Sequence, residues 1–137
     1  MNKDDIHLNI SSHPRFLQVA RAVSGKAARI MGFAQQDCRN IILAVDEACS
    51  NIIRHSYGGD PGGKIDLYFE LGAKALTIRI QDDGIQCDIK KMKPRNIEEL
   101  RPGGFGIYIM DKVMDSLEYN CSSHGRNQVT MTKNLTA

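Results

Sequence analysis

The sequence predicts an α+β fold in which helices cover one face of a largely antiparallel sheet. Apolar residues alternate with polar ones in several short segments, which is typical of half-buried strands. Apolar residues recur every three or four positions in other segments, which is typical of amphipathic helices. Short turns join neighbouring strands and make those pairs antiparallel. The 137 residues suit a single domain over 1–137.

The first half of the chain is expected to hold one strand and two helices. Alternation predicts a strand at 6–10, and a helix is predicted over 15–31, ended by Gly32. Asp37 would cap or charge the start of the second helix, which stops at the glycine-rich segment 56–63. The apolar stripe predicted for the first helix consists of Phe16, Val19, Ala20, Val23, Ala27 and Ile30.

The second half is expected to hold four strands and one helix. Strands at 65–71 and 76–80 would form a hairpin, and 82–102 is irregular. A helix opens at 103–106. The closing strands are predicted at 117–121 and 128–132, with a turn at 124–127.

Charge and hydropathy argue against several classes of protein. Eighteen basic and sixteen acidic residues give a formal charge of +2, too small to predict binding to nucleic acid or to a membrane surface. No apolar stretch is long enough to span a bilayer, and the N-terminal segment lacks a signal-peptide pattern. We therefore expect a cytoplasmic protein with reduced, mostly buried thiols. These thiols are Cys38, Cys49, Cys87 and Cys121.

The first cluster that could carry chemistry lies in the second predicted helix. Glu47 and Asn51 are four residues apart and share a helix face, away from the apolar stripe. Periodicity alone favours an ordinary solvated face. The chemical alternative is that the carboxylate accepts a proton and the amide oxygen ligates Mg²⁺.

The second cluster is Asp82-Asp83-Gly84, at the end of a predicted strand. A turn is the simpler interpretation, because aspartate and glycine are common turn residues. The alternative is a buried carboxylate that accepts a hydrogen bond from a ligand ring, beside a glycine that lets the ligand approach the backbone.

The third cluster is Gly103-Gly104-Phe105-Gly106, which leads into a helix. Free amides at a helix N-terminus can bind an anion. The cluster lacks the lysine of a P-loop and follows a loop rather than a strand, which argues against Walker and Rossmann sites.

The order and spacing of the three clusters resemble the N, G1 and G2 boxes of the GHKL ATPase superfamily. Residues 46–57, DEACSNIIRHSY, are similar to the D-E-A-x-x-N-x-x-x-H-[AS]-Y signature of bacterial anti-sigma factor serine/threonine kinases. Residues 103–110, GGFGIYIM, are similar to their G-G-x-G-[LI] box. Gln86 stands where many GHKL proteins have a second glycine, a departure that the anti-sigma subfamily often shares.

The resemblance implies a two-layer α/β sandwich of the GHKL type that binds ATP and Mg²⁺. Asn51 would ligate the metal, Glu47 would be the general base, and 88–103 would form a lid. Asp82 would accept from the adenine amino group, and Gly84 would give the ring room. The residues implied to hold the phosphates are Arg101, Gly104, Phe105 and Gly106.

The resemblance also implies a protein kinase that phosphorylates a STAS-type anti-anti-sigma protein, binds a sigma factor in its other state and forms a homodimer. ATP and ADP would select the partner. A partner surface is expected on the first helix, at Arg15, Gln18 and Arg21, whereas His55 and Tyr57 would pack or anchor a loop. The alternative is a nucleotide-dependent partner-switching module with little or no kinase activity.

Overall fold

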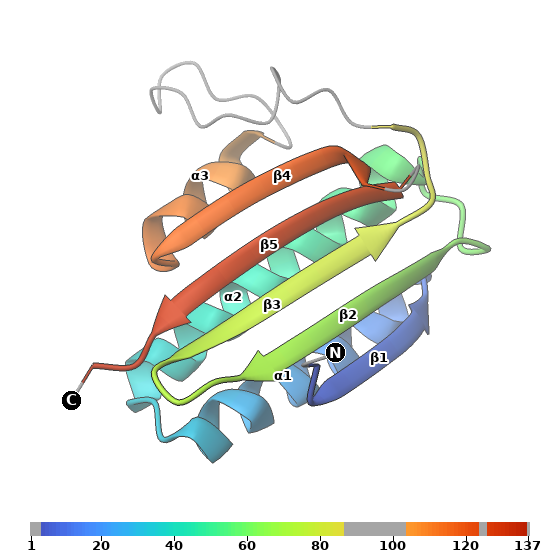
Figure 1. The fold of residues 1–137 in the computed structure, drawn as a ribbon. Helices are drawn as coiled ribbons and strands as arrows, with labels where there is room; N and C mark the ends of the chain where they lie inside the picture. The colour runs from blue at the N-terminus through green and yellow to red at the C-terminus, as the bar shows by residue number, and fades with distance from the viewer. Residues whose placement is uncertain (1–3, 87–103, 124–125, 137) are drawn as a thin grey trace.

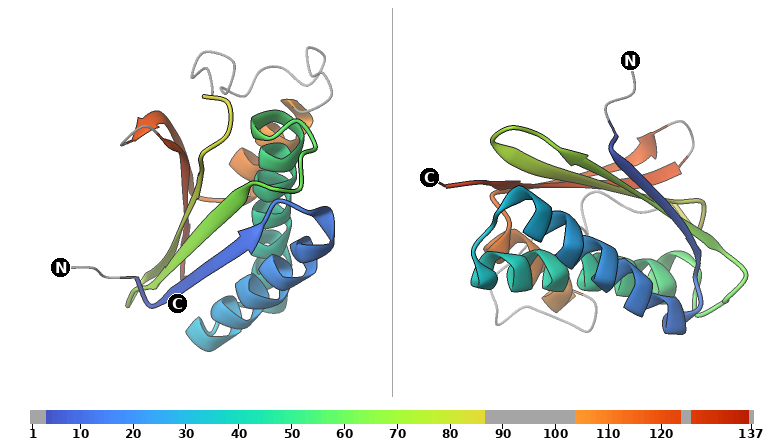
Figure 2. Two further views of the ribbon diagram at one scale, coloured as in Figure 1. Left: turned by 90° about the vertical axis from the view of Figure 1, so that its right-hand side faces the viewer. Right: turned by 90° about the horizontal axis from the view of Figure 1, so that it is seen from below.

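The computed structural model describes residues 4–86, 104–123 and 126–136. Its strands form one antiparallel sheet in the order β1-β2-β3-β5-β4. The α-helices lie on one face of this sheet, so the predicted α+β class is confirmed (Figures 1 and 2). The strands are β1 (Ile6–Ser11), β2 (Lys64–Leu71), β3 (Ala75–Asp82), β4 (Ser116–Ser123) and β5 (Arg126–Asn134). The helices are η1 (Pro14–Phe16), α1 (Leu17–Met31), α2 (Gln35–Asn51), η2 (Ile52–Ser56) and α3 (Gly104–Val113).

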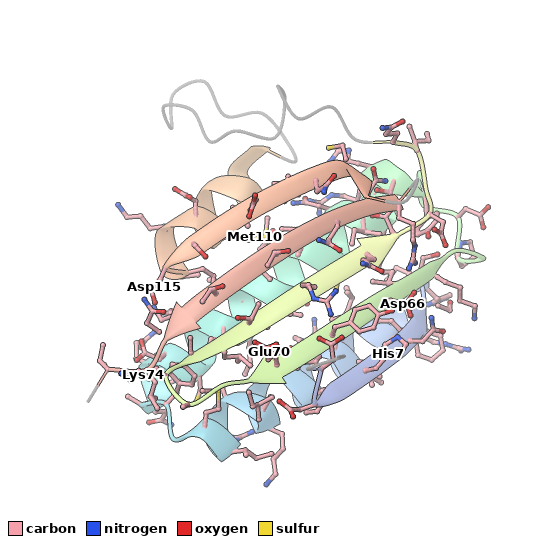
Figure 3. The ribbon with its side chains drawn as sticks, viewed as in Figure 1. His7, Asp66, Glu70, Lys74, Met110 and Asp115 are labelled. Carbon is pink, nitrogen blue, oxygen red and sulfur yellow. The ribbon has the colours of Figure 1, made fainter. Side chains whose placement is uncertain are left out.

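Alternation along the strands separates an apolar face from a polar one. In β2, Ile65, Leu67 and Phe69 are fully buried. Between them, Asp66 and Tyr68 face away from the helices, where Figure 3 shows Asp66 near His7 of β1. His7 Nε2 lies 2.7 Å from a carboxylate oxygen of Asp66. Polar side chains of neighbouring strands are therefore hydrogen-bonded to one another on the uncovered face of the sheet.

The first helical segment differs from the prediction at its start and in its apolar stripe. It opens with a 3₁₀ turn, η1, in which Nδ1 of His13 accepts from the Arg15 amide at 3.1 Å. It ends at Gly32 with φ +91, as predicted. Val19 and Ile30 are 40% and 62% exposed, so they were wrongly assigned to the core. The buried positions of α1 are Ala20, Ser24, Gly25, Ala27 and Ala28, which let α2 approach closely.

Helix α2 is the central helix and packs against both α1 and α3. It begins at Gln35 after Ala34, so Asp37 lies in its first turn and does not cap it. It continues into a π-helix, η2, which the sequence did not predict. In η2 the Tyr57 amide donates to Ile52 O at 3.0 Å. This wider turn shapes the end of the molecule where the candidate site lies.

The cysteines differ in state. Cys38 and Cys49 are free and buried, and burial, with a smaller contribution from Asp46, raises the pKa of the Cys49 thiol to about 12. Cys121 is disulfide-bonded, so the prediction of a reduced thiol is wrong there. Cys87 lies outside the described residues. Within the part of the chain that the structure describes, no helix has the length and apolarity needed to cross a membrane.

Candidate functional site

The end of α2 places Asn51 in an unusual environment. Asn51 is only 7% exposed, and its Oδ1 accepts from Nη2 of Arg54 at 2.7 Å. Its Nδ2 is buried and is the only such side-chain atom among the described residues that lacks a hydrogen-bond partner. An unsatisfied buried donor costs about 1–3 kcal/mol, and native proteins rarely keep one without a reason.

The structure contradicts the simpler interpretation of this helix face. Asn51 is not solvated, because α2 has neighbours on two sides and positions beyond its apolar stripe are also covered. Glu47, one turn earlier, is half-buried. The adjacent Asp46 pairs with Arg21 of α1 at 2.6 Å, whereas Glu47 makes no hydrogen bond or ion pair with another described residue. No other described residue therefore holds the Glu47 carboxylate in place.

Asp82 ends β3 and is 2% exposed, so it is a buried strand-end carboxylate, and its bond from the Gly84 amide two residues on also makes an Asx turn. Its Oδ1 accepts from the Gly84 amide at 2.9 Å and from Nδ2 of Asn127 at 2.9 Å. The Ser56 hydroxyl donates to the same carboxylate. Burial raises the pKa of Asp82, and the three hydrogen bonds oppose that shift without cancelling it.

Gly84 has a packing role that the sequence did not predict. A Cβ at this position would lie 2.3 Å from the carbonyl oxygen of Ser56, which leaves space only for glycine. The next amide, that of Ile85, donates to the same carbonyl at 2.8 Å. The segment after β3 is therefore packed directly on η2. The predicted role of Gly84 in giving a purine ring room stays a prediction.

The two predicted anchoring residues behave differently. The Tyr57 hydroxyl donates to Lys64 O at 2.6 Å and accepts from the Asp83 amide at 2.9 Å. Tyr57 therefore anchors the ends of two strands, as expected. His55 is exposed, so the structure gives it no packing role.

Asn127 is a site residue that the sequence analysis missed. It was assigned, with Arg126, to a turn, but both residues begin β5, where Asn127 pairs with Asp82. Its Nδ2 also donates to Ile85 O at 2.9 Å. The guanidinium of Arg126 donates to Asp66 at 2.8 Å and to Asp83 at 2.6 Å. The alternation of Val129 and Met131 was the available signal, since extending it backwards places residue 127 on the helix-facing side.

Helix α3 begins at Gly104, so the glycine cluster opens a helix as predicted. Gly104, Phe105 and Gly106 occupy its first turn, where backbone amides have no partner within the helix. Because α3 packs beside α2, this turn belongs to the same helical layer as Glu47 and Asn51. Arg101 and the predicted lid, 88–103, lie outside the described residues.

Helix η2 connects the first two clusters. It follows directly after Asn51, and its last residue, Ser56, contacts Ile85 through its backbone and Asp82 through its side chain. Figure 1 shows this end of α2 beside the end of β3. The structure thus brings a half-buried carboxylate, a buried amide and a buried strand-end carboxylate to one region.

Comparison with known proteins identifies the fold family. The sequence matches the histidine kinase-like ATPase domain family over residues 10–133. The chain belongs to this family. It is 30% identical to the serine-protein kinase RsbW of Oceanobacillus iheyensis, over 87% of this chain and 80% of the relative. It is 29% identical to the serine-protein kinase RsbW of Bacillus subtilis, over 98% of this chain and 88% of the relative.

These matches confirm the predicted superfamily and the resemblance to anti-sigma factor kinases, and the predicted enzyme class agrees with the names of the relatives. A crystal structure of the RsbU and RsbW domains of Rv1364c from Mycobacterium tuberculosis has a TM-score of 0.70 over 95% of this chain, with 17% identity. This chain spans 31% of that longer chain, and the likeness supports the fold alone.

The residues around Asn51 fit a metal-bound nucleotide. The orphaned Nδ2 shows that the amide is buried where no described residue satisfies it fully. The oxygen, the atom that could ligate a cation, accepts from Arg54, whose side chain is exposed and can turn away into solvent. The site therefore offers an amide oxygen to a cation once Arg54 moves.

Proposed function

We propose that this chain binds Mg²⁺ and ATP and transfers the γ-phosphoryl group to a serine or threonine of a STAS-type anti-anti-sigma protein. The observation that carries the proposal is the buried Asn51 amide with an orphaned nitrogen, one helical turn after Glu47. The family and the serine-protein kinase names of the relatives support the reaction class.

Two side chains of α2 would divide the chemistry. Glu47 accepts the proton of the attacking hydroxyl, whose oxygen bonds to the γ-phosphorus while the bond from that phosphorus to ADP breaks. Asn51 holds the cation through its amide oxygen. The bound cation would supply positive charge that screens the phosphates and orients them for transfer.

The remaining residues would bind the nucleotide. Asp82 accepts a hydrogen bond from the adenine amino group, with Gly84 beside it. Amides of the first turn of α3, at Gly104, Phe105 and Gly106, bind the phosphates because a helix N-terminus attracts anions. Arg101, in the proposed lid at 88–103, would add a phosphate contact.

We further propose that the chain works as a cytoplasmic anti-sigma factor that binds a sigma factor in one nucleotide state, and that it acts as a homodimer. Arg15 and Gln18 are exposed on the first helical segment and suit a partner surface. Arg21 is half-buried and bonded to Asp46, next to Glu47. A partner that contacts α1 would therefore lie close to the catalytic carboxylate.

A phosphotransfer assay tests the proposal. The chain is incubated with γ-labelled ATP, Mg²⁺ and a candidate STAS protein. The control is a copy of the STAS protein in which the candidate acceptor serine or threonine is replaced by alanine. Label on the unsubstituted STAS protein, and none on its alanine variant, supports the proposal. Thermal stabilisation by Mg-ATP without any label would support the binding-module alternative. No stabilisation at saturating Mg-ATP would contradict nucleotide binding altogether.

A further inference from the structure

The Tyr57 hydroxyl replaces a hydrogen bond between two strands. The register pairs Ile65 of β2 with Asp82 of β3, so the next pair of an antiparallel ladder would be Lys64 with Asp83. Instead, the Asp83 amide donates to the Tyr57 hydroxyl at 2.9 Å, and this hydroxyl donates to Lys64 O at 2.6 Å. The side chain thus separates the strand ends at the residue that follows Asp82.

The Tyr57 ring has little freedom to leave this position. A Cβ added to Gly63 would lie 2.5 to 2.6 Å from ring atoms, so the backbone before β2 lies directly against the ring. The Tyr57 amide is bonded to Ile52 O through the π-helix. The hydroxyl is therefore held at a fixed place between β2 and β3.

The segment that leaves β3 is held by two successive residues, the last residue of η2 and the one after it. Tyr57 holds Asp83 through its hydroxyl, and Ser56 holds Ile85 through its carbonyl oxygen at 2.8 Å. Gly84, between them, packs on Ser56 and donates its amide to the Asp82 carboxylate at 2.9 Å. The direction of that carboxylate consequently depends on where Tyr57 places the backbone of the next residue.

We infer that Tyr57 is a positioning residue for purine recognition: its hydroxyl sets the exit of β3 so that Asp82 faces the 6-amino group of adenine. The inference rests on the proposed function and assigns a specificity role to a residue outside the proposed ligand contacts. A buried acceptor discriminates well only when its geometry is fixed, because a ligand without the matching donor leaves the acceptor unpaired.

The test compares ATP with purine riboside triphosphate, which lacks the 6-amino group. Binding of each to the chain is measured by calorimetry with Mg²⁺. Wild type is expected to prefer ATP by about tenfold, the usual value of one well-placed hydrogen bond to a charged group. In Tyr57→Phe this preference should fall below about threefold through weaker ATP binding, with purine riboside triphosphate affinity retained within about twofold.

Tyr68→Phe is the matched control. Tyr68 lies on the uncovered face of the sheet, stacked on His7 with ring centroids 4.2 Å apart, and its loss of a hydroxyl should leave the tenfold preference intact. Hydrogen exchange at the Asp83 amide gives a readout that needs no nucleotide. Exchange should accelerate in Tyr57→Phe and stay slow in Tyr68→Phe, because only Tyr57 bonds that amide.

The outcomes separate the inference from the proposed function. If wild type binds neither nucleotide, the proposed function fails and the inference fails with it. If wild type prefers ATP and Tyr57→Phe keeps that preference, the inference alone is wrong. If Tyr57→Phe does not fold, hydrogen exchange in wild type replaces it, because the inference requires that the Tyr57 hydroxyl hold the Asp83 amide. Exchange of the Asp83 amide as fast as that of the exposed segment 58–62 would then overturn the inference.

Discussion

The two ends of the candidate site are built in opposite ways. At the end of β3, three donors hold the Asp82 carboxylate, from Ser56, Gly84 and Asn127. At the end of α2, one bond from an exposed arginine holds the Asn51 amide, and its nitrogen has no partner among the described residues. The end at Asp82 is therefore organised by protein hydrogen bonds alone, whereas the end at Asn51 keeps a buried N–H donor that an acceptor from a ligand, such as a phosphate oxygen, would satisfy.

Loss of the proposed base should give the largest effect. Glu47→Gln keeps the size of the side chain but removes its basicity, so phosphoryl transfer should fall by about 10²–10⁴-fold while Mg-ATP binding is retained. Rates of label transfer and calorimetric affinities measure the two effects. Asp46→Asn is the adjacent control and should keep transfer within about fivefold. Normal transfer by Glu47→Gln would remove it from the base role.

Asn51→Ala should separate binding from stability. Mg-ATP affinity is expected to fall by about 10- to 100-fold with loss of a group bonded to a cation. The free energy of unfolding should change by less than about 1 kcal/mol, because the substitution also removes an unsatisfied buried nitrogen. Asn40→Ala on the same helix serves as the control and should alter neither quantity. A large loss of stability with unchanged affinity would make Asn51 purely structural.

Asn127→Ala, unlike Asn51→Ala, should clearly lower the stability of the fold. It removes a donor from the buried Asp82 carboxylate and from Ile85 O, and should lower the free energy of unfolding by about 1–3 kcal/mol. Denaturant titration gives the value. Gln128→Ala, at the next position on the uncovered face, should cost less than about 1 kcal/mol. Equal losses for the two variants would contradict a special role for Asn127.

The smallest expected effect concerns the free energy of unfolding, to which two aspartates contribute with opposite dependence on pH. Burial raises the pKa of Asp82, so its contribution to stability is present below the ordinary value of 3.8 and is lost as pH rises through its folded-state pKa. For Asp66, burial acts in the same direction, but hydrogen bonds from Asn9, Arg126 and His7 outweigh it and lower the pKa. Its contribution is present above 3.8 and is lost as pH falls through its folded-state pKa.

Denaturant titrations of Asp82→Asn and Asp66→Asn across pH 3–7 measure this difference. The free energy of unfolding of Asp82→Asn, relative to that of wild type, should be highest at pH 7 and should fall towards acid pH. The free energy of unfolding of Asp66→Asn, relative to that of wild type, should be lowest at pH 7 and should approach the wild-type value towards acid pH. Parallel pH profiles for the two variants would contradict the assigned directions.

Local pattern was enough to predict most of the sheet and the helix-ending glycine. The alternation of Ile65, Leu67 and Phe69 indicates burial on one face of the strand. Gly32 adopts a left-handed backbone conformation that few other residues tolerate. The stripe of α1 was partly wrong because Val19 and Ile30 satisfy the helical period. Which apolar residues become buried is decided by the neighbouring helix, and that information is not local.

The ligand roles of the site residues stay predictions, whereas the hydrogen bonds that hold their side chains are described by the structure and were not predicted. The family resemblance proposed Glu47, Asn51 and Asp82 as site residues, whereas periodicity alone placed Asn51 on a solvated face. The bonds from Arg54 to Asn51 and from Asn127 to Asp82 join residues whose pairing depends on tertiary register. The π-helix had no sequence signal, because residues 52–56 are compatible with an ordinary α-helix.

The π-helix makes chain length itself a constraint at this end of the molecule. A π turn carries about one residue more than an α turn, so removing any one residue of 52–56 would let the helix revert to regular geometry. The Ile52 carbonyl and the Tyr57 amide, now five residues apart, would then be four apart and could keep their bond in α-helical geometry, so Tyr57 would stay near its place between β2 and β3. An insertion among the five residues before Tyr57 should accordingly turn its side chain by about 100° and move it from between the strands, whereas changes of length should be tolerated in the exposed segment 58–62.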